Sequence, residues 1–150
     1  MIRSARLYWA MFLVLAGAVM ADETRGTAAE AQAMVARAIA AYDAQGKAAF
    51  AAMNPPGTEF RDRDLYVFVV GPDNRTLVNG QDASRVGRDL AQTVDPGGKA
   101  FGKEIIEKAD ENGTWVDYAW RDPLTETVVQ KSSWVVRHDG YIFGCGIYKP

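Results

Sequence analysis

Apolar and polar residues alternate most clearly in the last third of the chain. The runs Thr114–Trp120, Thr127–Arg137 and Tyr141–Tyr148 are rich in aromatic and β-branched residues, which favour β-strands. Proline at Asp122-Pro123 sets the backbone for a turn between the first two runs. Asp139-Gly140, after His138, supplies the positive φ of a tight hairpin between the last two. The pattern therefore predicts a three-stranded antiparallel meander.

Two further strands are predicted upstream. Leu65–Val70 is apolar at every position, so both of its faces are expected to be covered. Arg75–Asn79 is expected to return as a shorter strand after the turn at Gly71-Pro72. Pairing residues 65–70 with residues 141–148 would place the two most apolar strands at the centre of one sheet.

Helical spacing of apolar residues appears at three places. Thr27–Tyr42 has one apolar stripe, and Thr27 with Glu30 forms a capping-box pattern. A short helix is predicted over Lys47–Met53, before a proline-rich stop. A third is predicted to start at Asp95-Pro96, as N-cap and first helical residue, and to end at Asn112-Gly113.

Two polar stretches precede predicted elements. Residues 22–26 are interpreted as a flexible lead-in to the first helix. Residues 61–64, whose charges alternate in sign, are interpreted as a solvated approach to the strand that follows. With the helices and strands above, the prediction is an α+β domain over residues 27–150. It is built on a five-stranded antiparallel, PAS-like sheet, with the long N-terminal helix packed on one face and a cavity on the other.

The N-terminus predicts export. Arg3 and Arg6 precede Leu7–Ala21, an uncharged and almost wholly apolar run, and Val19-Met20-Ala21 carries small residues where a signal peptidase reads them. Residues 1–21 are therefore interpreted as a signal peptide cleaved after Ala21, which gives a periplasmic or secreted protein. The alternative is an uncleaved segment that anchors the chain in the inner membrane, although the run is shorter than the roughly 20 residues of a spanning helix.

Composition narrows the chemistry further. The 17 basic residues are outnumbered by 19 acidic ones and form no cluster in the sequence, which argues against nucleic acid as a partner. With a single cysteine, no internal disulfide can form. One cysteine and one histidine are also too few for the usual zinc sites, and no cofactor is predicted. His138 is interpreted as a solvated turn residue, and Cys145 as a buried, inert thiol. The glycines on either side of Cys145 are interpreted as space left for a ligand.

The aromatic residues of the predicted sheet suggest a pocket for a small carboxylate. Lysine would supply charge, tyrosines would donate hydrogen bonds and tryptophans would form walls. The strand register decides which of them share a face, since a shift of one residue exchanges the two faces. The candidate ligand-binding residues are Tyr66, Trp115, Tyr118, Trp120 and Lys131, with lower weight on Phe68 and Ser133.

The ordered set of segments resembles a single Cache domain, the extracytoplasmic PAS-like sensor module of bacterial receptors. Beyond the long first helix and its break at Gly46-Lys47, the matching segments are Asp64–Val69, Val86–Leu90, Gly113–Trp120, Lys131–Val135 and Ile142–Tyr148. The resemblance implies non-catalytic sensing of small molecules, often short carboxylates or amino acids, with a basic residue at the position of Lys131. Members of that family usually continue into a transmembrane helix and an output domain. This sequence stops at Pro150, so a membrane receptor or histidine kinase is the expected signalling partner.

Two other functions stay open at this stage. An interaction protein that docks to such a receptor or kinase would use its aromatic face only as core, and a sheet without a cavity would favour it. A small cone-shaped α+β enzyme would need a buried carboxylate with a raised pKa, for which Asp117 is the candidate. Asp117 could instead pair with Arg121 or Lys131, and an exposed Asp117 would remove the enzyme hypothesis.

Overall fold

The computed structural model describes residues 23–57 and 59–149. The predicted signal peptide and its cleavage site lie outside this part of the chain. Among the described residues, no helix combines the length and the apolar character that crossing a membrane requires.

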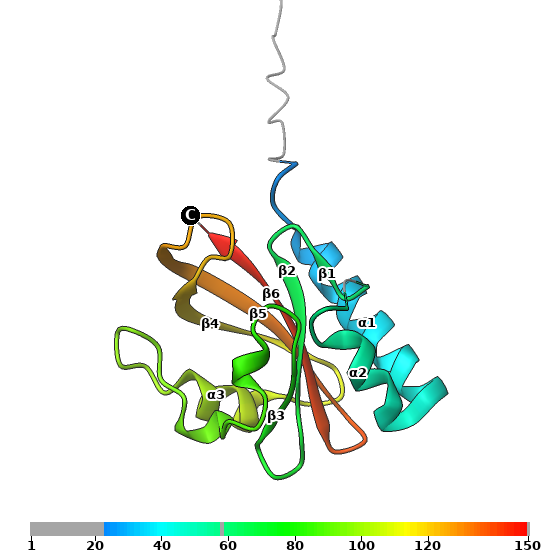
Figure 1. Ribbon diagram of the computed structural model, residues 1–150. Helices are drawn as coiled ribbons and strands as arrows, with labels where there is room; N and C mark the ends of the chain where they lie inside the picture. Colours follow the sequence, from blue (N-terminus) through cyan, green and yellow to red (C-terminus); the bar gives the residue numbers. More distant parts are fainter. Residues whose placement is uncertain (1–22, 58, 150) are drawn as a thin grey trace, which may run out of the picture.

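An antiparallel sheet forms the middle layer of the molecule (Figure 1). Its order is β1-β2-β6-β5-β4, and β3 also pairs with β2. The predicted pairing of residues 65–70 with 141–148 is confirmed, with Val67 opposite Cys145. The strands are β1 (Arg61–Asp62), β2 (Leu65–Val70), β3 (Thr76–Asn79), β4 (Thr114–Arg121), β5 (Val128–His138) and β6 (Tyr141–Lys149).

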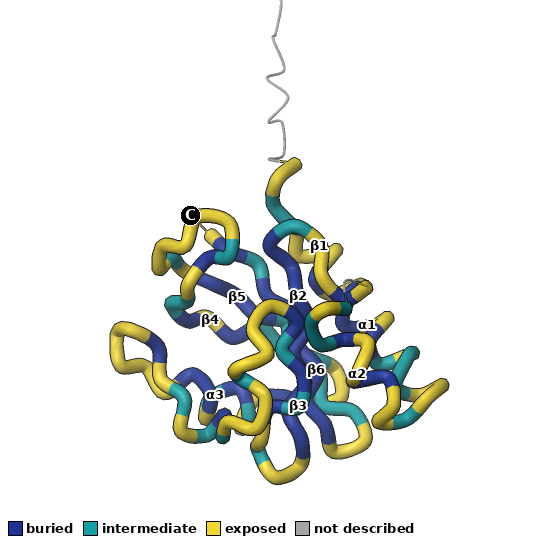
Figure 2. The backbone as a smooth tube through the Cα atoms, in the orientation of Figure 1, coloured by how far each residue is buried: buried dark blue, intermediate teal, exposed yellow. Residues whose placement is uncertain are grey.

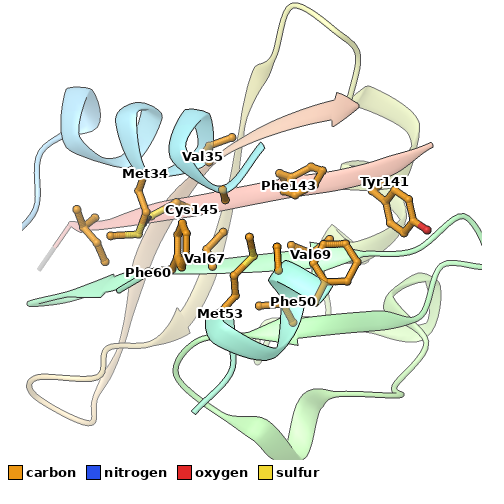
Figure 3. Close-up of a cluster of buried hydrophobic side chains, with 14 of the residues drawn as sticks. Met34, Val35, Phe50, Met53, Phe60, Val67, Val69, Tyr141, Phe143 and Cys145 are labelled. Carbon is orange, nitrogen blue, oxygen red and sulfur yellow. Dashed lines mark hydrogen bonds between the residues drawn. The ribbon is translucent and has the colours of Figure 1, made fainter. Parts of the chain in front are cut away.

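Two helices cover one face of this sheet. Helix α1 (Ala28–Gln45) begins at the predicted capping box, in which both reciprocal hydrogen bonds between Thr27 and Glu30 are present. It is followed by the short turn η1 (Gly46–Ala48) and helix α2 (Ala49–Met53). Figure 3 shows side chains of both helices packed against those of β2 and β6. The α+β architecture, an antiparallel sheet with the long helix on one face, is thereby confirmed, and the two-residue β1 adds a sixth strand to the five predicted.

Helix α3 (Phe101–Lys108) lies on the other side of the sheet. Phe68 and Val70 of β2 pack in one cluster with Phe101 and Ile105 of this helix, whereas the alternate residues of β2 face α1. Both faces of β2 are therefore covered, as its uniformly apolar sequence predicted. Figure 2 shows β2 and β6 as buried segments through the middle of the molecule.

The predicted limits of the third helix are wrong. It begins at Phe101 rather than after Asp95-Pro96, and it ends at Lys108, before the Asn112-Gly113 turn. The Asp95 carboxylate instead accepts hydrogen bonds from the backbone N–H groups of Ala119, Lys99 and Gly97, which lower its pKa. The donor at Ala119 belongs to the outer edge of β4, so Asp95 covers that sheet edge instead of capping a helix. The preceding loop holds two further single turns, η2 (Ala83–Arg85) and η3 (Leu90–Gln92).

The tip of the last hairpin is fastened to the end of α1. Asp139 and Gly140 adopt the positive φ values expected for the turn, 48° and 79°. His138, predicted as a solvated turn residue, is the last residue of β5, and its Nε2 lies 2.7 Å from the carboxylate of Asp43. The Tyr42 hydroxyl donates to Asp139 beside it. The His138 side chain is 37% exposed, and local sequence carries no sign of its contact with Asp43, because the two residues lie 95 positions apart.

The segment before α1 is fixed by a buried ion cluster rather than flexible. The Arg25 guanidinium lies 2.6 Å from Asp122 and 3.3 Å from Asp64, and both carboxylates are fully buried. The backbone N–H of Gly26 also donates to Asp64, at 2.7 Å. Burial raises the pKa of Asp122, but the hydrogen bonds from Arg25, the Leu124 backbone N–H and Thr125, together with the charge of Arg25, outweigh it and leave that pKa below its usual value. We call these three side chains the Arg25 cluster.

Cys145 is fully buried between the sheet and α1, with its Sγ 3.7 Å from the sulfur of Met34. Burial raises the pKa of this thiol to about 12. Since only the thiolate reacts, we expect the native protein to be labelled by a thiol reagent at pH 8 at least about 100-fold more slowly than the unfolded chain. Labelling in urea provides the reference rate. Rapid labelling of the native protein would contradict this expectation and would mean that α1 opens readily from the sheet.

Candidate ligand-binding cavity

A small cavity of about 50 Å³ lies on the sheet face opposite α1, between the sheet, α3 and the loop that carries η2 and η3. We call it the inner cavity. Its space suits a carboxylate group with one or two carbon atoms, since a single water needs about 10–15 Å³ on the same measure. Five of the residues that line it are aromatic: Tyr66, Phe68, Phe101, Tyr118 and Trp120.

Lys131 is the most unusual residue of the inner cavity. It is only 2% exposed, and its Nζ donates a hydrogen bond of 2.8 Å to the hydroxyl of Tyr66. The ammonium also lies 4.2 Å from the centre of the Tyr66 ring and 4.8 Å from that of Tyr148. The register explains this arrangement, because Lys131 on β5 stands between Tyr118 on β4 and Tyr148 on β6.

The Lys131 ammonium keeps its charge. Burial disfavours the charged form, but the neighbouring oxygens of Tyr118, Tyr66 and Tyr148 prevail and raise the pKa of Lys131 well above its usual value. Burial is the largest influence on the pKa values of Tyr118 and Tyr148 and raises both, although the charge of Lys131 acts in the opposite direction. No aspartate or glutamate of residues 23–57 and 59–149 forms an ion pair with Lys131. The result is a buried positive charge without a carboxylate to balance it.

Two arginines add to the positive charge. Arg85 and Arg88 line the inner cavity from the loop side, and none of the described acidic residues lines it. The guanidinium carbon of Arg85 lies 4.7 Å from the centre of the Trp120 ring, a cation–π distance, and its Nε lies 3.6 Å from Asp82. The Nε of Arg88 donates to the backbone carbonyl of Ser84. An anion is the ligand that such a cavity favours.

The structure brings most of the predicted site residues together. Tyr66, Phe68, Tyr118, Trp120 and Lys131 line the inner cavity. Ser133 is fully buried behind them, with its hydroxyl 2.8 Å from that of Tyr118, so it can orient the tyrosine.

Trp115 does not reach the inner cavity. It lies on the opposite face of β4, with its ring 5.4 Å from that of Trp134 in the cluster beneath α1. The reason is strand alternation, which sends residue 115 to one face and residues 118 and 120 to the other.

Sequence reasoning missed several residues of this site, among them two cations and two aromatic residues. Arg85, Arg88 and Phe101 line the inner cavity from the loop and α3, and Tyr148 lies beside the Lys131 ammonium. The only sequence signal was the pair of arginines three residues apart in a loop of otherwise few anchors. Nothing in the local sequence states that this loop folds over the sheet.

The glycines of β6 leave room for protein side chains, not for a ligand directly. A Cβ built on Gly144 would lie 2.1 Å from the Phe68 ring, and one on Gly146 would lie 2.3 Å from Cε of Lys131 and 2.4 Å from Oγ of Ser133. The space interpreted as ligand volume is therefore occupied by Phe68 and Lys131. Gly146 is what allows the lysine to lie flat against the sheet.

Gly146→Ala is expected to displace the Lys131 ammonium. The added carbon would overpack the strand, lowering the free energy of unfolding by about 1–3 kcal/mol. A misplaced charge should also weaken acetate binding about tenfold, which corresponds to about 1.4 kcal/mol. Urea unfolding and calorimetric titration measure the two effects. Gly97→Ala is the control, because its added carbon would meet only a carboxylate oxygen of Asp95, at 3.3 Å. Unchanged acetate affinity in folded Gly146→Ala would contradict the expectation.

Asp117 lies outside the inner cavity. Its side chain is 68% exposed, its carboxylate accepts from the Ser132 hydroxyl, and Lys149 lies 3.7 Å away. It forms an ion pair with neither Arg121 nor Lys131. Lys131 pairs with Tyr118 and so lies on the other face of the sheet, and Arg121 lies four residues farther along the same face of the extended strand. The buried carboxylate that the cone-shaped enzyme hypothesis required is therefore not Asp117.

Residues 10–148 match the sequence model of the family described as Single Cache domain 2. Among curated proteins, the sensor histidine kinase MctS of Rhizobium johnstonii is 31% identical over 88 residues, which is 57% of this chain and 19% of the kinase. The chain thus spans about a fifth of the length of that relative.

Solved structures of sensor domains share the fold. A methyl-accepting chemotaxis protein from Vibrio parahaemolyticus superposes with a TM-score of 0.67 at 17% identity, over 80% of this chain and 86% of that one. A periplasmic sensor domain of a chemotaxis protein gives 0.61 at 24% identity, over 81% and 90%. A Cache chemosensory domain described for carboxylic acid recognition gives 0.59 at 20% identity, over 81% and 88%.

Proposed function

The chain belongs to the Single Cache domain 2 family, and from this premise we propose that it is an extracytoplasmic module that binds short carboxylates and senses them without catalysis. One observation carries the proposal. The Lys131 ammonium is buried, charged and not balanced by any described carboxylate. A buried charge of this kind is costly unless it is paired, and a carboxylate ligand is the partner that the inner cavity can admit.

Six of the residues that line the inner cavity have assigned roles in this proposal. Lys131 pairs with the carboxylate, and Tyr66 and Tyr118 hold it with hydroxyl hydrogen bonds. Phe68 and Trp120 exclude water around the short carbon chain, and Arg88 strengthens the positive potential from the loop side. Charge-assisted hydrogen bonds of this type contribute about 1.5–3 kcal/mol each.

The comparisons support the ligand class and the signalling role by analogy. One solved Cache chemosensory domain is described for carboxylic acid recognition. The curated relative is a sensor histidine kinase. We propose that this module likewise serves signal transduction, with a membrane receptor or histidine kinase as partner. The proposed location is the periplasm or the exterior, after cleavage behind Ala21, with N-terminal anchoring as the alternative.

Thermal unfolding tests the proposal. Sodium acetate, propionate and pyruvate should each raise the melting temperature above that in sodium chloride of equal ionic strength. A ligand at 100 times its Kd adds about 2.7 kcal/mol to the free energy of unfolding. Folded protein that none of these acids stabilises would refute the carboxylate proposal. The alternative, an interaction protein that docks to a receptor or kinase without binding a ligand, predicts a sheet without a cavity. The inner cavity therefore speaks for the ligand-binding proposal.

A further inference from the structure

The inner cavity adjoins a second and much larger hollow. This outer cleft has about 520 Å³, compared with about 50 Å³ for the inner cavity. The two spaces share four lining residues, Tyr66, Asn79, Arg85 and Trp120, so they meet along one boundary. A carboxylate held at Lys131 therefore has space beyond its second carbon for a longer tail.

One wall of the outer cleft is apolar. Trp120 continues into it from the inner cavity. Val128, which pairs with Arg121 at the end of the β4–β5 ladder, also lines the hollow, with half of its surface (50%) exposed. Pro96 and Pro123 line the same hollow. An isolated exposed valine needs no explanation, but an exposed valine and a half-buried tryptophan that line the same cleft offer surface that an apolar group would cover favourably.

The charges of the outer cleft differ from those of the inner cavity. Arg85 is matched by Asp82, at 3.6 Å, and Asp122 by Arg25, at 2.6 Å. Of the other charged residues that line it, Glu126 and Arg121 oppose each other in sign. The outer cleft is thus close to neutral, whereas the inner cavity has only cations. A ligand that fits both carries one carboxylate at its inner end and no second charge on its tail.

We propose that this site selects monocarboxylates with an extended apolar or aryl tail, the carboxylate at Lys131 and the tail in the outer cleft against Trp120 and Val128. This specificity rests on the proposed function, since it assumes that the carboxylate binds in the inner cavity. The proposed tail subsite lies where β4 ends and β5 begins.

A chain-length series tests the tail subsite. Calorimetric titration with the sodium salts of acetate, propionate, butanoate, hexanoate and 3-phenylpropionate gives the affinities. Each methylene buried beyond propionate is expected to raise the affinity about threefold to fourfold. Hexanoate should therefore bind at least about 30-fold more tightly than acetate, and 3-phenylpropionate more tightly than propionate.

Two matched variants locate the effect. Val128→Asp places a charge in the outer cleft and should weaken hexanoate at least about tenfold, and acetate much less. Leu124→Asp is the control, because Leu124 is exposed to a similar extent (47%) in the β4–β5 connection that leads to Val128 but does not line either hollow. It should leave the whole series unchanged.

The outcomes separate the two proposals. Acetate binding with an affinity that stays flat or falls along the series would overturn the tail subsite and leave the carboxylate proposal standing. Equal losses in Val128→Asp and Leu124→Asp would also overturn it, since the effect would then be general surface charge. Failure of every acid to bind the folded protein would overturn both proposals.

Discussion

Lys131→Met is expected to weaken the binding of short carboxylates at least about 100-fold. The substitution keeps the length of the side chain but removes the buried ammonium that would pair with the ligand. Loss of two charge-assisted hydrogen bonds at about 1.5 kcal/mol each is about 3 kcal/mol, or roughly two powers of ten in Kd. Calorimetric titration with acetate measures this loss directly.

The same substitution should not harm the fold. Without ligand, the ammonium is a buried charge that no described carboxylate balances, and an apolar side chain of similar size removes that cost. The free energy of unfolding without ligand should therefore stay the same or rise. Lys149→Met is the matched control, because Lys149 is 55% exposed and pairs with Asp117 away from the inner cavity. Acetate affinity within a few-fold of the wild type in folded Lys131→Met would refute the assigned role of Lys131.

Arg25→Met is expected to cost about 3–5 kcal/mol of stability at pH 7, because it leaves the buried carboxylates of Asp64 and Asp122 without their partner. Urea unfolding measures the loss. Arg61→Met is the control, since Arg61 is exposed on the two-residue strand β1, and its substitution should change stability by less than about 0.5 kcal/mol. Similar small losses in both variants would contradict the role of the Arg25 cluster.

The pH dependence of Arg25→Met distinguishes an ion cluster from simple packing. In the wild type the pKa of Asp122 is lowered on folding. The stability it contributes is thus present above the unfolded pKa of about 3.9 and is lost as pH falls through the lower folded pKa. In Arg25→Met, burial acts without the guanidinium and raises the folded pKa above the unfolded one. The variant should then recover part of its lost stability between pH 7 and pH 5. A loss that stays constant over this range would indicate lost packing alone.

The features that sequence reasoning predicted correctly depend on neighbours in the chain or on burial of whole segments. The capping box needs only Thr27 and Glu30, and the last hairpin needs only Asp139-Gly140. The central pairing of β2 with β6 followed because two wholly apolar strands both require covered faces. These signals act over a few residues or through composition, so tertiary contacts did not alter them.

The features that failed involve partners far apart in sequence. Asp95 looked like a local helix cap but bonds to Ala119, 24 residues away. Arg25 lies in the stretch interpreted as a flexible lead-in but pairs with two carboxylates, one of them 39 residues away. Trp115 was grouped with Tyr118 and Trp120 on aromatic content, although alternation along β4 places residue 115 on the other face, where it packs in the cluster beneath α1.

The sequence by itself determined the fold class, the family resemblance and a lysine among aromatic residues on one sheet. Only the tertiary structure decided which aromatic residues face Lys131, that Arg85 and Arg88 fold over it from a loop, and that the inner cavity continues into an outer cleft. The physical reason is the range of the forces involved. Propensity and periodicity are local, whereas a binding site is made by the register of strands and the closure of a loop. Both are set by packing of the whole chain.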